Sequence, residues 1–181
     1  MKICSAKTGM LKSDALSMNN INESVDTSLL EFYRQYSAFM DPGEYEYLYK
    51  NLPDSLPDLC KLIKSQFLHP YEDLPKYREQ IPEERWNESF NYPTVKSILD
   101  GLLSYDSPGI VKNRKPEARL VLGCNQNAII LASILKYRGI PARVRYGHAT
   151  YFITGFHISH TICEVWNENE MRWMLVDPKK L

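Results

Sequence analysis

Three residues in the last third of the chain have the types that nucleophilic acyl transfer requires: a cysteine, a histidine and an aspartate. Cys124 follows Gly123 and precedes a run of small and apolar residues, whereas His160 and Asp177 are the two ends of the stretch HTICEVWNENEMRWMLVD. A thiolate is a nucleophile, an imidazole can take up the thiol proton, and a carboxylate can orient the imidazole. The chain therefore contains the parts of a cysteine triad, provided that the fold brings them together.

The segment after Cys124 predicts a helix that is buried on most sides. From Asn127 to Tyr137 nearly every residue is apolar or small. Gly139 is typical of a helix end, and Pro141 prevents continuation. Cys124 would then lie at the helix N-terminus, where free N–H groups and the positive end of the dipole stabilise a thiolate and can donate to an oxyanion. The alternative interpretation of Cys124 is a small buried hydrophobe that precedes a helix.

The stretch from His160 to Asp177 predicts a β-hairpin. Its loop, residues 167–170, has the sequence NENE, and both flanks are rich in strand formers. In a symmetric hairpin Trp166 lies opposite Met171, and His160 lies opposite Asp177. Directly opposed residues point to the same face of a sheet, with Cβ atoms about 5 Å apart. The hairpin would therefore hold the imidazole beside the carboxylate. A cross-strand surface pair without a function is the alternative.

The rest of the pattern predicts an α+β protein whose first two thirds are mainly helical. Residues 1–27 are rich in Ser, Asn, Asp and Lys, which predicts a flexible arm. Helical spacing, caps and turn residues predict helices within 27–39, 45–52, 57–69 and 92–106. The domain boundaries that follow are 1–27 for the arm, 28–115 for a helical region and 116–181 for the core. A strand over 140–146, where apolar residues alternate with arginines, follows the buried helix.

Composition and charge limit the possible functions. The 181 residues contain 22 Lys plus Arg and 22 Asp plus Glu, so no net positive field attracts nucleic acid. No apolar run is long enough to span a membrane, and the first 20 residues lack the apolar stretch of a secretory signal. We therefore expect a cytoplasmic protein that binds neither nucleic acid nor membrane. Its four cysteines, at positions 4, 60, 124 and 163, should be thiols.

These motifs resemble the transglutaminase-like superfamily, whose core belongs to the papain-like cysteine-protease group. The resemblance is carried by GCNQNAIILASILKYRGIPARVRYG, HTICEVW and RWMLVDP. In the family a cysteine opens the core helix, a GIPAR-type phrase begins a strand, a histidine begins the next strand and an aspartate ends the third. The matching positions are Cys124, residues 139–143, His160 and Asp177. The phrases at 41–43 (DPG), 56–60 (LPDLC) and 147–152 (GHATYF) resemble one bacterial branch of these proteins.

The resemblance implies a papain-like fold, a buried helix packed on an antiparallel sheet, and cysteine-dependent acyl transfer on peptide or carboxamide substrates. Cys124 would attack the carbonyl, His160 would transfer the proton and Asp177 would orient His160, with no cofactor. Hydrolysis is favoured over amine crosslinking, because nothing in the sequence marks an amine-binding tunnel or a calcium site. Family members continue well past the aspartate, so we expect a core that is shortened at its C-terminus. The sequence does not indicate the oligomeric state.

Other interpretations stay open at this point. His157, His160 and Cys163, with His148 nearby, could hold a metal, although a strand would point His160 and Cys163 to opposite faces. A non-catalytic binding module that keeps the fold is a second alternative. The loop HATYFITGFHIS could line a substrate cleft through its aromatic residues or simply pack at the end of the sheet. For His69 a cap or surface imidazole is the interpretation that the sequence favours.

Overall fold

The computed structural model describes residues 26–180, in which helices and strands together form an α+β fold. The predicted flexible arm, apart from its last two residues, and Cys4 lie outside the described residues. The helices are α1 (Thr27–Arg34), α2 (Leu56–Lys64), α3 (Leu74–Tyr77), α4 (Val95–Tyr105) and α5 (Cys124–Tyr137). The strands are β1 (Phe67–Leu68), β2 (Leu120–Val121), β3 (Ala142–Ala149), β4 (Ile158–Asn167) and β5 (Arg172–Val176).

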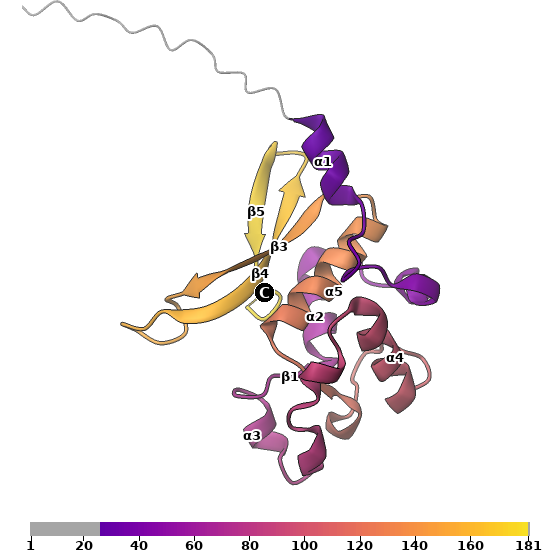
Figure 1. Ribbon diagram of the computed structural model, residues 1–181, viewed down its shortest axis with the longest axis vertical. Coiled ribbons are helices and arrows are strands. Elements are labelled where there is room, and N and C mark those ends of the chain that lie inside the picture. Colours follow the sequence, from indigo (N-terminus) through magenta and orange to yellow (C-terminus); the bar gives the residue numbers. More distant parts are fainter. Residues whose placement is uncertain (1–25, 181) are drawn as a thin grey trace, which may run out of the picture.

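Helix α5 lies at the centre of the molecule, between the sheet and the other helices (Figure 1). Strands β3 and β4 contact it on one side, and α2 and α4 contact it elsewhere. Every residue from Asn127 to Lys136 is buried, as the nearly continuous apolar sequence predicts. Gly139 has a positive φ of 72° and ends the helix, and the N–H of Ile140 bonds back to the Leu135 carbonyl at 2.9 Å. The predicted buried helix and its glycine end are confirmed.

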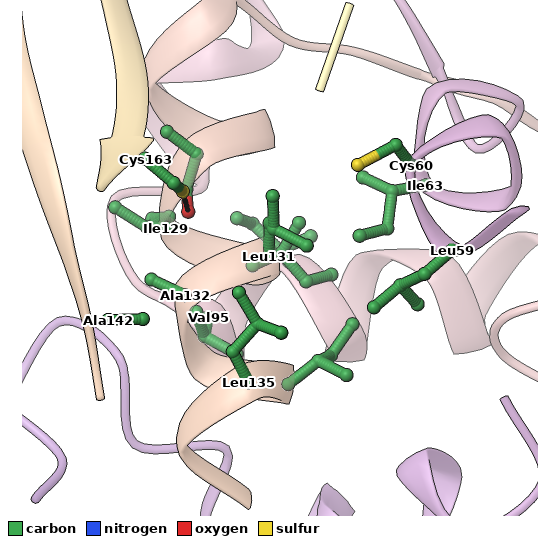
Figure 2. Close-up of a cluster of buried hydrophobic side chains, with 14 of the residues drawn as sticks. Leu59, Cys60, Ile63, Val95, Ile129, Leu131, Ala132, Leu135, Ala142 and Cys163 are labelled. Atoms are coloured by element: carbon green, nitrogen blue, oxygen red, sulfur yellow. Dashed lines mark hydrogen bonds between the residues drawn. The ribbon is translucent and has the colours of Figure 1, made fainter. Parts of the chain in front are cut away.

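One hydrophobic core joins the helical region to the sheet. Figure 2 shows Leu59, Cys60 and Ile63 of α2 on one side of Leu131, and Cys163 of β4 on the other. All five side chains are at most 1% exposed. Burying such a side chain contributes about 2 kcal/mol. The helical region is therefore packed against the same core that supports the strands.

Strands β3, β4 and β5 form an antiparallel sheet in that order. The register of the β4–β5 hairpin differs from the predicted one by two residues. Trp166 lies opposite Trp173 and not Met171, and Asn167 lies opposite Arg172. The cause is the loop, which begins one residue later than predicted. The Asn167 carboxamide oxygen accepts the N–H groups of residues 169 and 170, and Met171 adopts a left-handed φ of 51°.

This shift keeps the face of each residue, because the side-chain period of a strand is two. The predicted direct opposition of His160 and Asp177 is nevertheless wrong. The β4–β5 ladder ends at the pair Cys163 and Val176, so Asp177 follows the last paired residue. Its carboxylate reaches His160 from just beyond the end of β5.

The N-terminal helices differ from the sequence pattern in their lengths. Helix α1 ends at Arg34, where Gln35 is extended, and its N-cap is Asp26. The helix predicted within 27–39 is therefore shorter than the pattern allows, Leu30 is its one buried residue, and Phe39 beyond it is 60% exposed. The segment predicted as a second helix is a 3₁₀ helix, Gly43–Tyr49.

Helix α4 and the short strands complete the helical region. Thr94 is the N-cap of helix α4 and forms a reciprocal capping box with Ser97, within the segment 92–106 that the sequence predicts as helical. Strands β1 and β2 form a two-stranded parallel pair, Phe67 with Leu120 and Leu68 with Val121, which the sequence did not indicate. No helix within residues 26–180 has the length and apolar character to cross a bilayer.

Candidate active site

Cys124 is the first residue of α5 and is half-buried. Gly123 precedes it in an extended conformation and supplies no side-chain cap. The N–H groups of the first helical turn have no intrahelical acceptor, so they and the helix dipole create a positive potential at the sulfur. Such an environment stabilises a thiolate, and the same N–H groups can donate to a developing oxyanion.

His160 and Asp177 form a nearly buried pair. The Nε2 atom of His160 lies 2.9 Å from Oδ2 of Asp177, and the two side chains are 7% and 12% exposed. The second carboxylate oxygen, Oδ1, accepts the backbone N–H of Lys179 at 2.9 Å. A carboxylate held through both oxygens fixes the orientation of the imidazole, whose Nδ1 is then the nitrogen that can serve a nucleophile.

Two aromatic residues of the loop between β3 and β4 support this pair. The Tyr151 hydroxyl donates to Oδ2 of Asp177 at 2.7 Å. Burial, and then the hydrogen bond to the Asp177 carboxylate, raises the pKa of Tyr151 well above its ordinary value, so the phenol remains a donor. The ring of Phe152 lies edge-on to the His160 imidazole, with centroids 4.8 Å apart. Of the other aromatic residues in this loop, Phe156 is 64% exposed.

Cys124 and His160 lie on the wall of one cavity of about 950 Å³. Phe152 and Ile158 contribute apolar surface to it, and Trp86 contributes more from the helical region. Within residues 26–180 no hydrogen bond joins the Cys124 sulfur to His160, whose ring is bonded through Nε2 to Asp177. The cavity therefore contains a thiol at a helix N-terminus and an oriented imidazole that are not hydrogen-bonded to each other.

The residues considered for a metal do not gather. Among residues 26–180 no cluster of three or more His, Cys, Asp or Glu side chains could hold an ion. Cys163 is fully buried, and its thiol donates to the Ala128 carbonyl at 3.1 Å. His157 is exposed in the loop before β4. His160 is bonded to Asp177, so these three side chains have different surroundings.

The cavity is also lined by residues that the sequence did not indicate. His69, directly after β1, lines it together with Glu72 and Lys179, which form an ion pair at 2.7 Å. Lys180 lines it as well and lies 4.7 Å from the centre of the Phe152 ring. These groups come from separate parts of the chain, and no local motif marks them. Only the tertiary fold brings them to Cys124.

Comparisons with known proteins give one structural likeness. No family model matches the chain, and no curated protein matches it. The crystal structure of "a Putative Cysteine Protease from Cytophaga hutchinsonii" is similar over 67% of this chain, with 17% sequence identity and a TM-score of 0.29. The similar region spans 43% of the length of that protein.

Proposed function

We propose that the chain catalyses cysteine-dependent acyl transfer on peptide or carboxamide substrates, with Cys124, His160 and Asp177 as a triad on a papain-like core. The observation that carries the proposal is the arrangement at the cavity. Cys124 begins a buried helix, and on the same wall an imidazole is held at 2.9 Å by a carboxylate that is itself fixed at both oxygens. A nucleophile and a base on one substrate-sized cavity, with an orienting carboxylate bonded to the base, fit this reaction class.

The proposed reaction has two halves. The Cys124 thiol gives its proton to Nδ1 of His160, and the sulfur attacks the carbonyl carbon of the amide. The N–H of Cys124 donates to the oxyanion. The carbon–nitrogen bond then breaks, His160 protonates the leaving amine, and a thioester remains. Water attacks the thioester with His160 as base, the carbon–sulfur bond breaks, and the thiol is restored.

We favour hydrolysis over transfer to an amine. The cavity is bordered by exposed residues such as Phe90, Ser159 and Lys180, so water has access to a thioester on Cys124. The acceptor must approach Cys124 and His160 together, and water needs no binding site of its own to do so.

The proposal is tested with a defined mixture of unmodified peptides, incubated with the protein with and without methylamine and analysed by mass spectrometry. Hydrolysis of a backbone or side-chain amide yields a carboxylate, whereas transfer yields a methylamide. We expect hydrolysis by the wild type, none by Cys124→Ala, and a rate roughly 100-fold lower for Asp177→Asn, in which the tautomer of His160 is no longer fixed. Identical peptides after incubation with wild type and Cys124→Ala would refute it.

One observation favours a second candidate, a non-catalytic module that binds amide-containing peptides. Within the described residues, the Cys124 thiol and the His160 imidazole are not hydrogen-bonded. This candidate predicts that the same peptides shift the NMR signals of residues on the cavity wall without being cleaved. Cleavage that depends on Cys124 would exclude it.

A further inference from the structure

His69 lies on the wall of the same cavity as Cys124 and His160, although it comes from the helical region. A tight turn after β1 fixes its backbone. The His69 N–H donates to a carboxylate oxygen of Asp73 at 3.0 Å, and its carbonyl accepts the N–H groups of Asp73 and Leu74, also at 3.0 Å. The ring packs edge-on against Tyr71, with centroids 5.9 Å apart. The imidazole is therefore held at a defined place in the cavity wall.

The two ring nitrogens of His69 differ in their surroundings. Nδ1 is fully buried and has no hydrogen-bond partner among the described residues. Nε2 has no partner there either, but it is not fully buried, and it belongs to a side chain that lines the cavity. A buried N–H without an acceptor is rarer and less favourable than a buried lone pair. We therefore assign the proton of the neutral ring to Nε2, where it is available to a molecule in the cavity.

His69 also keeps the neutral form that this assignment requires. Burial, and next the Lys179 cation, lowers the pKa of His69, and these effects outweigh the opposing carboxylates of Glu72 and Asp73. A neutral imidazole with one N–H can polarise a carbonyl group without giving up its proton.

Three other side-chain donors of the cavity wall are already engaged. The Trp86 indole N–H donates to the Ile81 carbonyl at 3.0 Å, and the Gln126 amide donates to the Ser89 carbonyl at 3.3 Å. The Lys179 ammonium is paired with Glu72. Among the described residues, His69 is thus a fixed donor without an acceptor, in a cavity where the proposed reaction needs groups that bind a carbonyl oxygen.

We infer that His69 is a substrate-binding residue whose Nε2–H donates to a carbonyl oxygen of the acyl substrate. The inference rests on the proposed function, because it assumes that an acyl group enters the cavity to react with Cys124. It adds a donor to the backbone N–H groups of α5, from a different element of the fold. The helical region would then take part directly in substrate binding as well as in the core.

The test compares two reagents that both react with Cys124 but differ in one group. 4-Nitrophenyl acetate has a carbonyl oxygen: the sulfur bonds to the acetyl carbon, and 4-nitrophenolate leaves. 2,2′-Dithiodipyridine has none: the sulfur bonds to a disulfide sulfur, and thiopyridine leaves. Rates at Cys124 are measured in the full chain by peptide mapping for wild type, His69→Ala, His69→Gln and His160→Ala. In His69→Gln the amide nitrogen can donate in place of Nε2.

We expect His69→Ala to acetylate Cys124 about 10-fold more slowly than wild type, because one hydrogen bond to the carbonyl is lost. The rate with 2,2′-dithiodipyridine should not change, and His69→Gln should recover most of the acetylation rate. A wild-type acetylation rate in His69→Ala overturns the inference. So does an equal loss with both reagents, or a His69→Gln variant as slow as His69→Ala.

Failure of the proposed function gives a different result. Cys124 would then react slowly with 2,2′-dithiodipyridine in the wild type, and His160→Ala would not alter that rate. Normal His160-dependent reactivity together with unchanged acetylation in His69→Ala would refute the role of His69 alone.

Discussion

The first turn of α5 and the middle of the same helix show how different two regions of one element can be. At its start, Cys124 is half-buried on a cavity wall, beside N–H groups without intrahelical acceptors. In the middle, Leu131 and Ala132 are 0% exposed and lie between α2 and the sheet. Strand β4 repeats the contrast within three residues, since His160 lines the cavity whereas Cys163 is enclosed.

The comparison indicates that the core supports the reactive side chains without taking part in the chemistry. Cysteines in the two regions have opposite environments. Burial raises the pKa of the Cys60 thiol to about 12 and raises that of Cys163 further, so both are protonated at neutral pH. Only a thiol outside the dry core can meet solvent, substrate and a base.

Replacing one cysteine from each region by alanine should produce the largest difference in reactivity and stability. Cys124→Ala should remove the His160-dependent reactive thiol entirely and change the free energy of unfolding by less than about 0.5 kcal/mol. Cys163→Ala should leave Cys124 reactive but lower the free energy of unfolding by about 1 kcal/mol or more, because it empties part of the core. Peptide mapping after alkylation and urea unfolding measure the two effects. Equal destabilisation by both changes would contradict the contrast.

Leu131→Ala tests how much the buried middle of α5 contributes to stability. Removing this fully buried side chain should lower the free energy of unfolding by about 3 kcal/mol, through lost burial and a residual cavity. Urea unfolding followed by circular dichroism gives the value. The exposed Leu175, at 65%, is the matched control, and Leu175→Ala should cost less than about 0.5 kcal/mol. Similar losses for the two variants would show that α5 is not the centre of the core.

The pH dependence of stability should reveal the buried Cys60 thiol. Its pKa in the folded protein is raised to about 12, above the roughly 8.5 of an unfolded thiol. The contribution of this thiol to the free energy of unfolding is therefore fully present below pH 8.5. It is lost as the pH rises towards 12, because only the unfolded thiol releases its proton. Between these values wild type should lose about 1.4 kcal/mol per pH unit more than Cys60→Ala. Unfolding curves with parallel pH dependence would refute the buried, protonated thiol.

Tyr151→Phe should have the smallest effect, and it tests the reactivity of the cavity region. It removes the hydroxyl that donates to Asp177 but keeps the ring beside His160. Asp177 retains His160 and the Lys179 N–H as partners, so the rate of alkylation at Cys124 should fall only about threefold. Tyr146→Phe, on the exposed part of β3, is the control. A loss as large as that of Asp177→Asn would mean that Tyr151 itself acts in the reaction.

Much of the fold could be predicted because local chemistry determined it. The apolar run after Asn127, the glycine at 139 and the Thr94 cap each specify a helix boundary or a buried face through nearby residues. The β4–β5 register was predicted less well. It depends on an Asn167 side chain that accepts backbone N–H groups and on a left-handed Met171, and the polar loop sequence alone allows more than one such turn.

The site could be predicted only in part, because only some of its residues stand in local patterns. Cys124, His160 and Asp177 stand in recognisable local patterns, and the structure brings the last two into contact. His69 has no such pattern, and for Tyr151 the sequence offered only an aromatic loop that could line a cleft or pack at the end of the sheet. Their roles depend on which side chains lie across the cavity, and on buried nitrogens or carboxylates that no local rule reveals. Contacts between distant segments were therefore what the sequence could not supply.

The most direct test of the central claim is the rate of iodoacetamide alkylation at Cys124, measured by peptide mapping from pH 4 to 9. Wild type is compared with His160→Ala, and His157→Ala serves as the control because that histidine is exposed in the loop before β4. The account predicts rapid alkylation below pH 7 that His160→Ala abolishes and His157→Ala preserves. Alkylation that rises only near pH 8.5, alike in all three proteins, is the behaviour of an ordinary thiol and would contradict it.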